Sequence, residues 1–249
     1  MANENTYFWL IITLAFVMTV LSGTIANRRR RLPTLRHISG YEAMPRAVDE
    51  SIESDRRVHL STGSAAVGQT STITAIAATS IIYALTERQS FLNRSPLVTL
   101  TDPVTMAMTN DILRKAYMAR ENLTAYRSRV ISWFPQGQNS VVFGAGAAIR
   151  AKNMDTSSHI MVGEFGPELA FIGESSMRFR QNFVAASTSL EGQAIAYAQS
   201  DAPLIGEEIF VGSAYLEPQS ALFMGGVVAL DALRWTIIIA IIIAAIVNA

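Results

Sequence analysis

Hydrophobic residues are distributed unevenly along the chain, in two long apolar runs separated by a mixed region. Residues 7–26 form an uncharged run of twenty residues, and residues 233–249 form a second run in which Arg234 is the only charged residue. Twenty helical residues are roughly 30 Å long, which matches the hydrocarbon core of a bilayer. The pattern therefore predicts transmembrane helices over 7–26 and 233–249.

The charges around the first run favour an uncleaved anchor over a cleaved secretory signal. A secretory signal has basic residues before its apolar segment, whereas residues 1–6 contain only one charged side chain, Glu4. The basic residues come after the run instead: Arg28, Arg29, Arg30, Arg31 and, further on, Arg36. Arginines beside a span mark its cytoplasmic end and attract anionic lipid head groups. We expect a protein of the cell (inner) membrane, with its N-terminus outside and residues 27–232 in the cytoplasm.

The second run is short for a span, because its uninterrupted apolar part, Trp235 to Val247, contains thirteen residues, or roughly 20 Å of helix. If it does span, Asp231 and Arg234 would lie at the cytoplasmic interface, where Arg234 can extend toward water and Trp235 can anchor at the head groups. The alternative is a buried core helix of the soluble domain. No side chain of the run is charged and only Thr236 carries a hydroxyl, which favours the span.

The mixed region alternates short apolar runs with amphipathic segments, which is typical of strands and helices. Met44, Val48 and Ile52 recur every four residues, as on one helix face, and Asp102–Pro103 is a strong helix start. The expected strands are 58–61, 96–101, 130–134, 159–162, 169–172, 183–186 and 203–205, with at least one hairpin within 159–186. The expected helices are 44–57, 70–91, 102–127, 141–151, a short one from 189, and 207–216. This alternation predicts one α/β domain with a mostly parallel sheet covered by helices on both faces.

Together these features predict six regions. They are an extracytoplasmic N-terminus at 1–6, a transmembrane helix at 7–26, a basic linker at 27–40, a cytoplasmic α/β domain at 41–220, a connector at 221–232 and a transmembrane helix at 233–249.

Composition narrows the chemistry further. The chain has no cysteine, which excludes disulfides, thiolate catalysis and cysteine metal sites. Its net charge is zero, but residues 1–150 hold 16 basic and 10 acidic side chains, whereas residues 151–249 hold 4 and 10. This asymmetry suits head-to-tail contact between copies, so we expect a homo-oligomer. The lipid bilayer already explains the basic run, and no nucleic-acid partner is expected.

The best candidate for ligand binding is Gly63 to Thr70, GSAAVGQT, between a predicted strand and a predicted helix. It matches the phosphate-binding pattern G-x-x-x-x-G-K-[ST] except that Gln69 replaces the lysine. The backbone could still hold an anion weakly, although a plain strand-to-helix turn explains the same residues. The candidate binding residues are Ser61, Thr62, Gly63, Gly68, Thr70 and Asp102, and Asp102 is explained equally well as a helix cap.

Two further groups of residues are weaker candidates. Paired carboxylates can catalyse acid–base chemistry or bind cations if they converge in space, and the acids concerned are Glu164, Glu168, Glu174, Glu207 and Glu208. His59 and His159 lie in apolar strand-like segments without metal-ligand spacing, which favours buried, hydrogen-bonded side chains. We predict no catalytic residue, no metal and no cofactor.

Three strings resemble an uncharacterised family of bacterial membrane proteins. They are GEFGPELAFIGE at 163–174, LIGEEIFVGSAYL at 204–216 and LDALRW at 230–235. The resemblance implies a domain of unknown function with an N-terminal anchor, a cytoplasmic α/β domain and a C-terminal transmembrane helix. It implies no activity.

Three functions are compatible with the sequence. The first is a membrane-anchored, non-catalytic structural or scaffold protein that self-associates through its cytoplasmic α/β domain. The second is a sensor of a small ligand or anion that uses the Gly63–Thr70 loop. The third is an enzyme that uses the glutamates.

Overall fold

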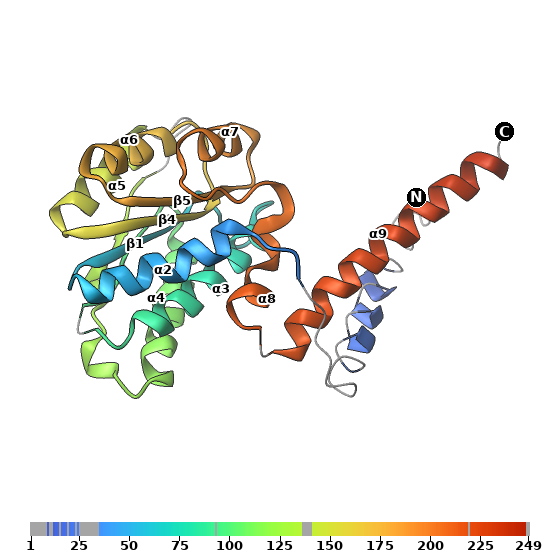
Figure 1. Ribbon diagram of the computed structural model, residues 1–249, viewed down its shortest axis with the longest axis horizontal. Coiled ribbons are helices and arrows are strands. Elements are labelled where there is room, and N and C mark those ends of the chain that lie inside the picture. The colour runs from blue at the N-terminus through green and yellow to red at the C-terminus, as the bar shows by residue number, and fades with distance from the viewer. Residues whose placement is uncertain are drawn as a thin grey trace. The chain divides into compact units, whose positions relative to one another are not determined.

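The chain forms two compact units, 37–216 and a second that combines 1–36 with 217–249. The computed structural model describes residues 9, 12–14, 16–18, 20–22, 24, 35–92, 94–135, 141–218 and 220–247. Unit 37–216 is an α/β domain built on a five-stranded parallel sheet (Figure 1). The predicted fold class is therefore confirmed for this part of the chain.

The strands lie in the order β3-β2-β1-β4-β5. Their bounds are β1 Arg57–Gly63, β2 Leu97–Leu100, β3 Ile131–Trp133, β4 Thr156–Glu164 and β5 Asn182–Ser187. The central strand β1 pairs with β2 on one side and with β4 on the other, and His59 lies opposite His159. Strands β1 and β2 are buried along almost their whole length, as expected for a parallel sheet with both faces covered.

Two layers of helices cover the sheet, one on each face (Figure 1). The first layer contains α2 Ser39–Glu53, α3 Thr72–Gln89, α4 Pro103–Ala119 and α8 Gly212–Leu216. It buries the larger hydrophobic core, with side chains such as Met44, Ile82 and Leu113. The second layer contains α5 Val141–Asn153, α6 Leu169–Phe179 and α7 Leu190–Gln199. Its core is centred on Phe143, Phe165 and Phe183.

Most of the predicted elements form within a few residues of the expected bounds, and α4 shows why. Asp102 caps this helix by accepting a hydrogen bond from the backbone N–H of Thr105 at 2.6 Å, and Pro103 occupies the first helical position. The helix ends at Ala119, earlier than predicted, and the chain continues through the 3-10 turns η1 Leu123–Ala125 and η2 Ser128–Val130.

Four predictions for the C-terminal half of the domain are wrong. Residues 169–172 belong to helix α6 instead of a strand, because Leu169, Ile172, Gly173 and Ser176 are buried at helical spacing. The expected hairpin is absent from the described residues of this region, since β4 and β5 run parallel with α6 between them. Residues 203–205 contribute an isolated bridge between Leu204 and Ala186 in place of a strand. The helix expected over 207–216 is divided into η3 Gly206–Val211 and α8.

The second unit contains the helix α9 Ala221–Val247. Within this unit the Ser22 hydroxyl donates a hydrogen bond to the carbonyl oxygen of Gly225 at 2.6 Å. Arg234 lies 3.5 Å from Asp231, three residues earlier on α9, and Trp235 is 65% exposed.

In the part of the chain that the structure describes, no helix combines the length and the apolar character needed to cross a membrane. The two predicted spans therefore lack support from the described residues. Most of 7–26 and all of Arg28 to Arg31 lie outside them. In α9 the Asp231–Arg234 pair precedes the apolar run 235–247, and the last two residues of the second predicted span, 248 and 249, also lie outside the described residues.

Candidate ligand-binding site at the carboxyl edge of the sheet

The strand order places a crevice between the carboxyl ends of β1 and β4. After β1 the chain passes to α3 on one face of the sheet, whereas after β4 it passes to α6 on the other face. The two connections diverge from neighbouring strands, and open parallel sheets bind their ligands at such a point.

A cleft of about 410 Å³ occupies this edge. It is lined by Thr70, Ser71, Thr74, Glu164, Thr188, Gln193, Gly206, Glu207 and Phe210. These residues come from the start of α3, the end of β4, the segment after β5, the first turns of α7, and η3. The lining is mainly hydroxyl, amide and carboxylate groups with one aromatic ring, and its size suits a small molecule.

Two glycines at the floor of this edge allow β1 and β4 to approach closely. Gly63 has a φ of +61°, and a Cβ there would overlap the carbonyl oxygen of Glu164. A Cβ on Gly163 would overlap the carbonyl oxygen of Thr62 in the same way. Both positions therefore require glycine for steric reasons, and Gly63 also for its left-handed backbone.

The Gly63–Thr70 loop is a turn in which the backbone N–H groups of residues 64–68 already have protein acceptors. The N–H groups of Ser64 and Ala65 donate to the carbonyl oxygens of Glu164 and Thr62. Those of Ala66, Val67 and Gly68 donate to the hydroxyls of Ser71, Thr105 and Thr72, at 3.0, 3.2 and 2.9 Å. A phosphate-binding loop needs such N–H groups to point at the anion, so this loop does not have the form of an anion cradle.

The structure separates the residues predicted for this site. Thr70 lines the cleft and is exposed. Ser61 is buried and donates to the carbonyl oxygen of Thr99 at 2.6 Å, while Thr62 is buried with no hydrogen-bond partner for its hydroxyl in the described chain. Gly63 and Gly68 shape the turn, and Asp102 caps α4. Ligand binding at these residues remains a prediction.

The five glutamates also fall in different places. Glu164 and Glu207 line the cleft together. Glu168 is buried and accepts a hydrogen bond from the backbone N–H of Gly166, Glu174 pairs with Arg178, and Glu208 accepts one from the N–H of Ile205. Among the described residues, no three His, Cys, Asp or Glu side chains are placed to share a metal ion.

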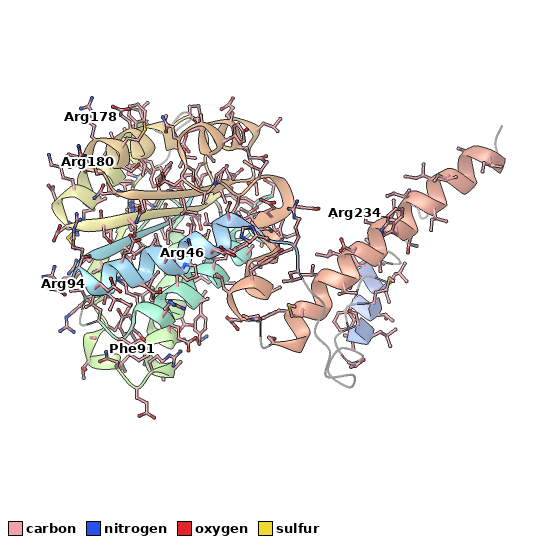
Figure 2. All side chains as sticks on the ribbon, in the orientation of Figure 1. Arg46, Phe91, Arg94, Arg178, Arg180 and Arg234 are labelled. Carbon is pink, nitrogen blue, oxygen red and sulfur yellow. The ribbon has the colours of Figure 1, made fainter. Side chains whose placement is uncertain are left out.

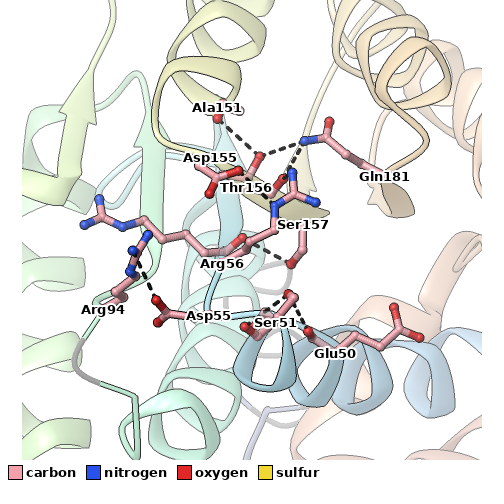
Figure 3. Close-up of polar contacts among 12 residues, drawn as sticks. Glu50, Ser51, Asp55, Arg56, Arg94, Ala151, Asp155, Thr156, Ser157 and Gln181 are labelled. Carbon is pink, nitrogen blue, oxygen red and sulfur yellow. Dashed lines mark hydrogen bonds and ion pairs between the residues drawn. The ribbon is translucent and has the colours of Figure 1, made fainter.

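The two strand histidines form a buried hydrogen-bonded chain across the sheet, as predicted for buried, hydrogen-bonded side chains. His59 Nε2 lies 2.8 Å from the Thr99 hydroxyl, and His59 Nδ1 lies 2.9 Å from His159 Nδ1. His159 Nε2 lies 2.8 Å from Gln181 Oε1. The amide nitrogen of Gln181 in turn donates to the carbonyl oxygen of Thr156, at 2.6 Å (Figure 3).

One pattern of protons satisfies this whole chain. A carbonyl oxygen only accepts, so the Gln181 amide nitrogen must face Thr156 and its oxygen must face His159. His159 therefore carries its proton on Nε2 and accepts at Nδ1 from His59, which accepts at Nε2 from Thr99. Both rings are neutral in this pattern. Burial lowers the pKa of His159 to about 4, and burial together with the neighbouring His159 holds the pKa of His59 well below its usual range.

Several residues of the cleft were missed by the sequence interpretation. Thr188 and Gln193 follow β5, and Gly206 and Phe210 belong to η3. Thr188 could have been found, because it directly follows a correctly predicted parallel strand and such positions meet at one edge of the sheet. Phe210 could not, since 207–216 was expected to form a single helix.

Comparison with known proteins gives a family and no activity. No curated protein and no solved structure matches the chain. The expected membership in an uncharacterised family is confirmed, and neither a bacterial origin nor membrane character is part of that match. The family model described as a domain of unknown function, DUF6754, matches residues 1–249, and the chain therefore belongs to this family.

Proposed function

We propose that the α/β domain binds a small polar molecule in the cleft at the carboxyl edge of its sheet, and that the protein acts as a non-catalytic sensor. The observation that carries this proposal is the position of the cleft between the diverging connections of β1 and β4. Of the three functions compatible with the sequence, this is the second, with the binding site moved from the Gly63–Thr70 backbone to the cleft beside it.

The proposal can be tested by filling the cleft. Thr70 is exposed and lines the cleft, whereas Gln69 is exposed on the same turn and lies outside it. Thr70→Trp and Gln69→Trp are therefore a matched pair. A panel of small metabolites bearing hydroxyl, amine or carboxylate groups would be screened by thermal shift with the full-length protein.

A bound ligand should raise the melting temperature saturably in the wild type and in Gln69→Trp, and the shift should be lost in Thr70→Trp. A ligand at about a hundredfold its Kd stabilises the folded state by about 2.7 kcal/mol, which is several degrees for a domain of this size. A stabilising compound that is unaffected by Thr70→Trp would place binding elsewhere. A panel without any stabilising compound would argue against the sensor.

We further propose that the unit formed by 1–36 and 217–249 attaches the protein to the membrane, with 37–216 on the cytoplasmic side. Large apolar side chains of α9 support this: Trp235, Ile241 and Ile246 are 65%, 63% and 71% exposed. Exposed apolar surface of this kind marks membrane or protein interaction sites. Deletion of both 1–36 and 217–249 should release the protein from sedimented membranes, and a remaining domain 37–216 that stays bound to membranes would contradict the attachment.

Self-association remains a second candidate role, because one surface groove suits a further copy of the chain. A groove of about 220 Å³ lies between α5 and α6, and Ile149, Phe171 and Phe179 line it while remaining 61%, 44% and 44% exposed. Lys152, Glu174 and Arg178 also line it, so both charge signs are present for a self-complementary contact. A scaffold built from such contacts would be compatible with ligand sensing in the cleft, because the two sites have no lining residue in common.

A further inference from the structure

The charged groups of the cleft all have one sign. Among the residues that line it, Glu164 and Glu207 are the only ionisable ones, and none is lysine, arginine or histidine. The carboxylate of Glu164 has no ion pair and no hydrogen bond with any described residue, although it ends a strand at the floor of the cleft. A carboxylate in this position favours a cationic ligand group and disfavours a phosphate.

The charged side chains along the surrounding edge of the sheet are also negative. The ends of the strands and the segments that follow them carry the carboxylates of Asp102, Glu164, Glu168, Glu191, Glu207 and Glu208 and no lysine or arginine. Arginines gather near the amino ends of the strands, where Arg94, Arg178 and Arg180 extend outward (Figure 2). Several are paired there, as Arg56 with Asp155 and Arg94 with Asp55 (Figure 3). The separation produces a negative potential at the cleft, which attracts cations.

The remaining lining groups suit an ammonium group. Thr70 and Thr188 offer hydroxyl oxygens that can accept hydrogen bonds from it, and the half-exposed ring of Phe210 offers a π face. The backbone N–H groups of 64–68, which an anion would need, are directed to protein acceptors. We infer that the cleft binds a small organic cation through an ammonium group, with Glu164 as its counter-ion and Phe210 beside it. This inference rests on the proposed function and specifies the class of ligand.

Three small molecules of equal length can show whether binding in the cleft depends on the charge of the ligand or only on its shape. Putrescine, 1,4-butanediol and succinate each have a four-carbon chain and end in ammonium, hydroxyl and carboxylate groups respectively. Isothermal titration of the full-length protein should show saturable binding of putrescine and no comparable binding of the other two. Added salt should weaken the binding only partly, because a contact ion pair is screened less than a distant charge.

Matched glutamate variants test the assigned counter-ion. Glu164→Gln keeps the shape of the side chain and should weaken putrescine binding by roughly tenfold or more, because a charge-assisted hydrogen bond is lost. Glu191→Gln removes one charge from the same edge outside the cleft lining and should change the affinity by less than about threefold. Melting temperatures without ligand would verify that both variants fold.

The possible outcomes distinguish a wrong ligand class from a wrong location of the site. Absence of putrescine binding overturns the inference, and so does an equal loss of affinity in Glu164→Gln and Glu191→Gln, which would indicate attraction to the acidic edge alone. If butanediol or succinate binds and Thr70→Trp abolishes that binding, the cleft is a ligand site and only the assignment of a cation is wrong. Putrescine binding that survives Thr70→Trp would overturn both the inference and the proposed location of the site.

Discussion

The buried histidine chain makes the stability of the domain dependent on pH in a calculable way. His59 and His159 are fully buried, and their hydrogen bonds to Thr99 and Gln181 are complete only when both rings are neutral. The folded-state pKa of His159 is about 4, whereas an unfolded histidine titrates near 6.5. Between these values the unfolded chain binds a proton that the native chain does not.

This difference in pKa between the folded and the unfolded chain determines the direction and the size of the pH effect on stability. The unfolded state binds more protons in this window. The stabilising contribution of the neutral buried histidines is therefore fully present above about pH 6.5 and is lost as the pH falls toward 4. Each pH unit costs about 1.4 kcal/mol per histidine, so His159 alone removes about 3 kcal/mol over the window. His59 acts in the same direction, since burial and its neighbour also lower its pKa.

Urea denaturation at a series of pH values would measure the effect. The double variant His59→Gln/His159→Gln keeps donors and acceptors in the chain but carries no titrating ring, so its unfolding free energy should lose most of the slope between pH 6.5 and 4. His37→Gln removes an exposed histidine beside Glu42 and serves as a control with the wild-type slope. Equal slopes in the wild type and the double variant would refute the buried neutral pair, whatever the absolute stability of the variant.

Three further predictions concern packing, capping and assembly. Gly163→Ala introduces a Cβ that overlaps a backbone oxygen of β1, and it should lower the unfolding free energy by about 1–3 kcal/mol or more in urea denaturation. Asp102→Ala removes the cap of α4 and should cost about 1 kcal/mol, whereas Asp111→Ala breaks only an exposed pair with Lys115 and should cost less than about 0.5 kcal/mol; equal losses would contradict the capping role. Ile149→Glu places a charge in the α5–α6 groove and should reduce the sedimentation coefficient of the purified protein if copies meet there, whereas an unchanged oligomer would contradict that interface.

The fold was predictable where a local signal agreed with the final packing. Asp102 and Pro103 determine the start of α4 in sequence and structure alike. Strand β2 was recognisable because it is buried along its whole length and Thr99 is its only polar residue. In these elements the local preference and the tertiary contacts point to the same conformation.

Prediction failed where a short apolar run suited two conformations. Leu169 to Ile172 reads equally well as a strand and as the first turn of a helix. The structure is helical because Gly173 and Ser176 extend the same buried face, and a Cβ on Gly173 would meet the side chains of Gln199 and Phe183. Small residues at the contact give no hydrophobic signal, so the periodicity becomes visible only once the partners are known.

The candidate site was less predictable than the fold, because its residues are joined by strand order and not by sequence. Thr70 was named for its place in a phosphate-like motif, yet it lines the cleft through the turn in which the motif folds, while the N–H groups of 64–68 turn inward. Glu164 gains its position only because β4 lies beside β1, which places Thr70 and Glu164 at one edge although they are far apart along the chain. The glycines Gly63 and Gly163 permit that pairing by removing two side chains from the place where the strands meet. Gly63 to Thr70 thus resembles an anion site in the sequence, whereas in the folded domain Thr70 lines a cleft whose ionisable lining residues are both glutamates.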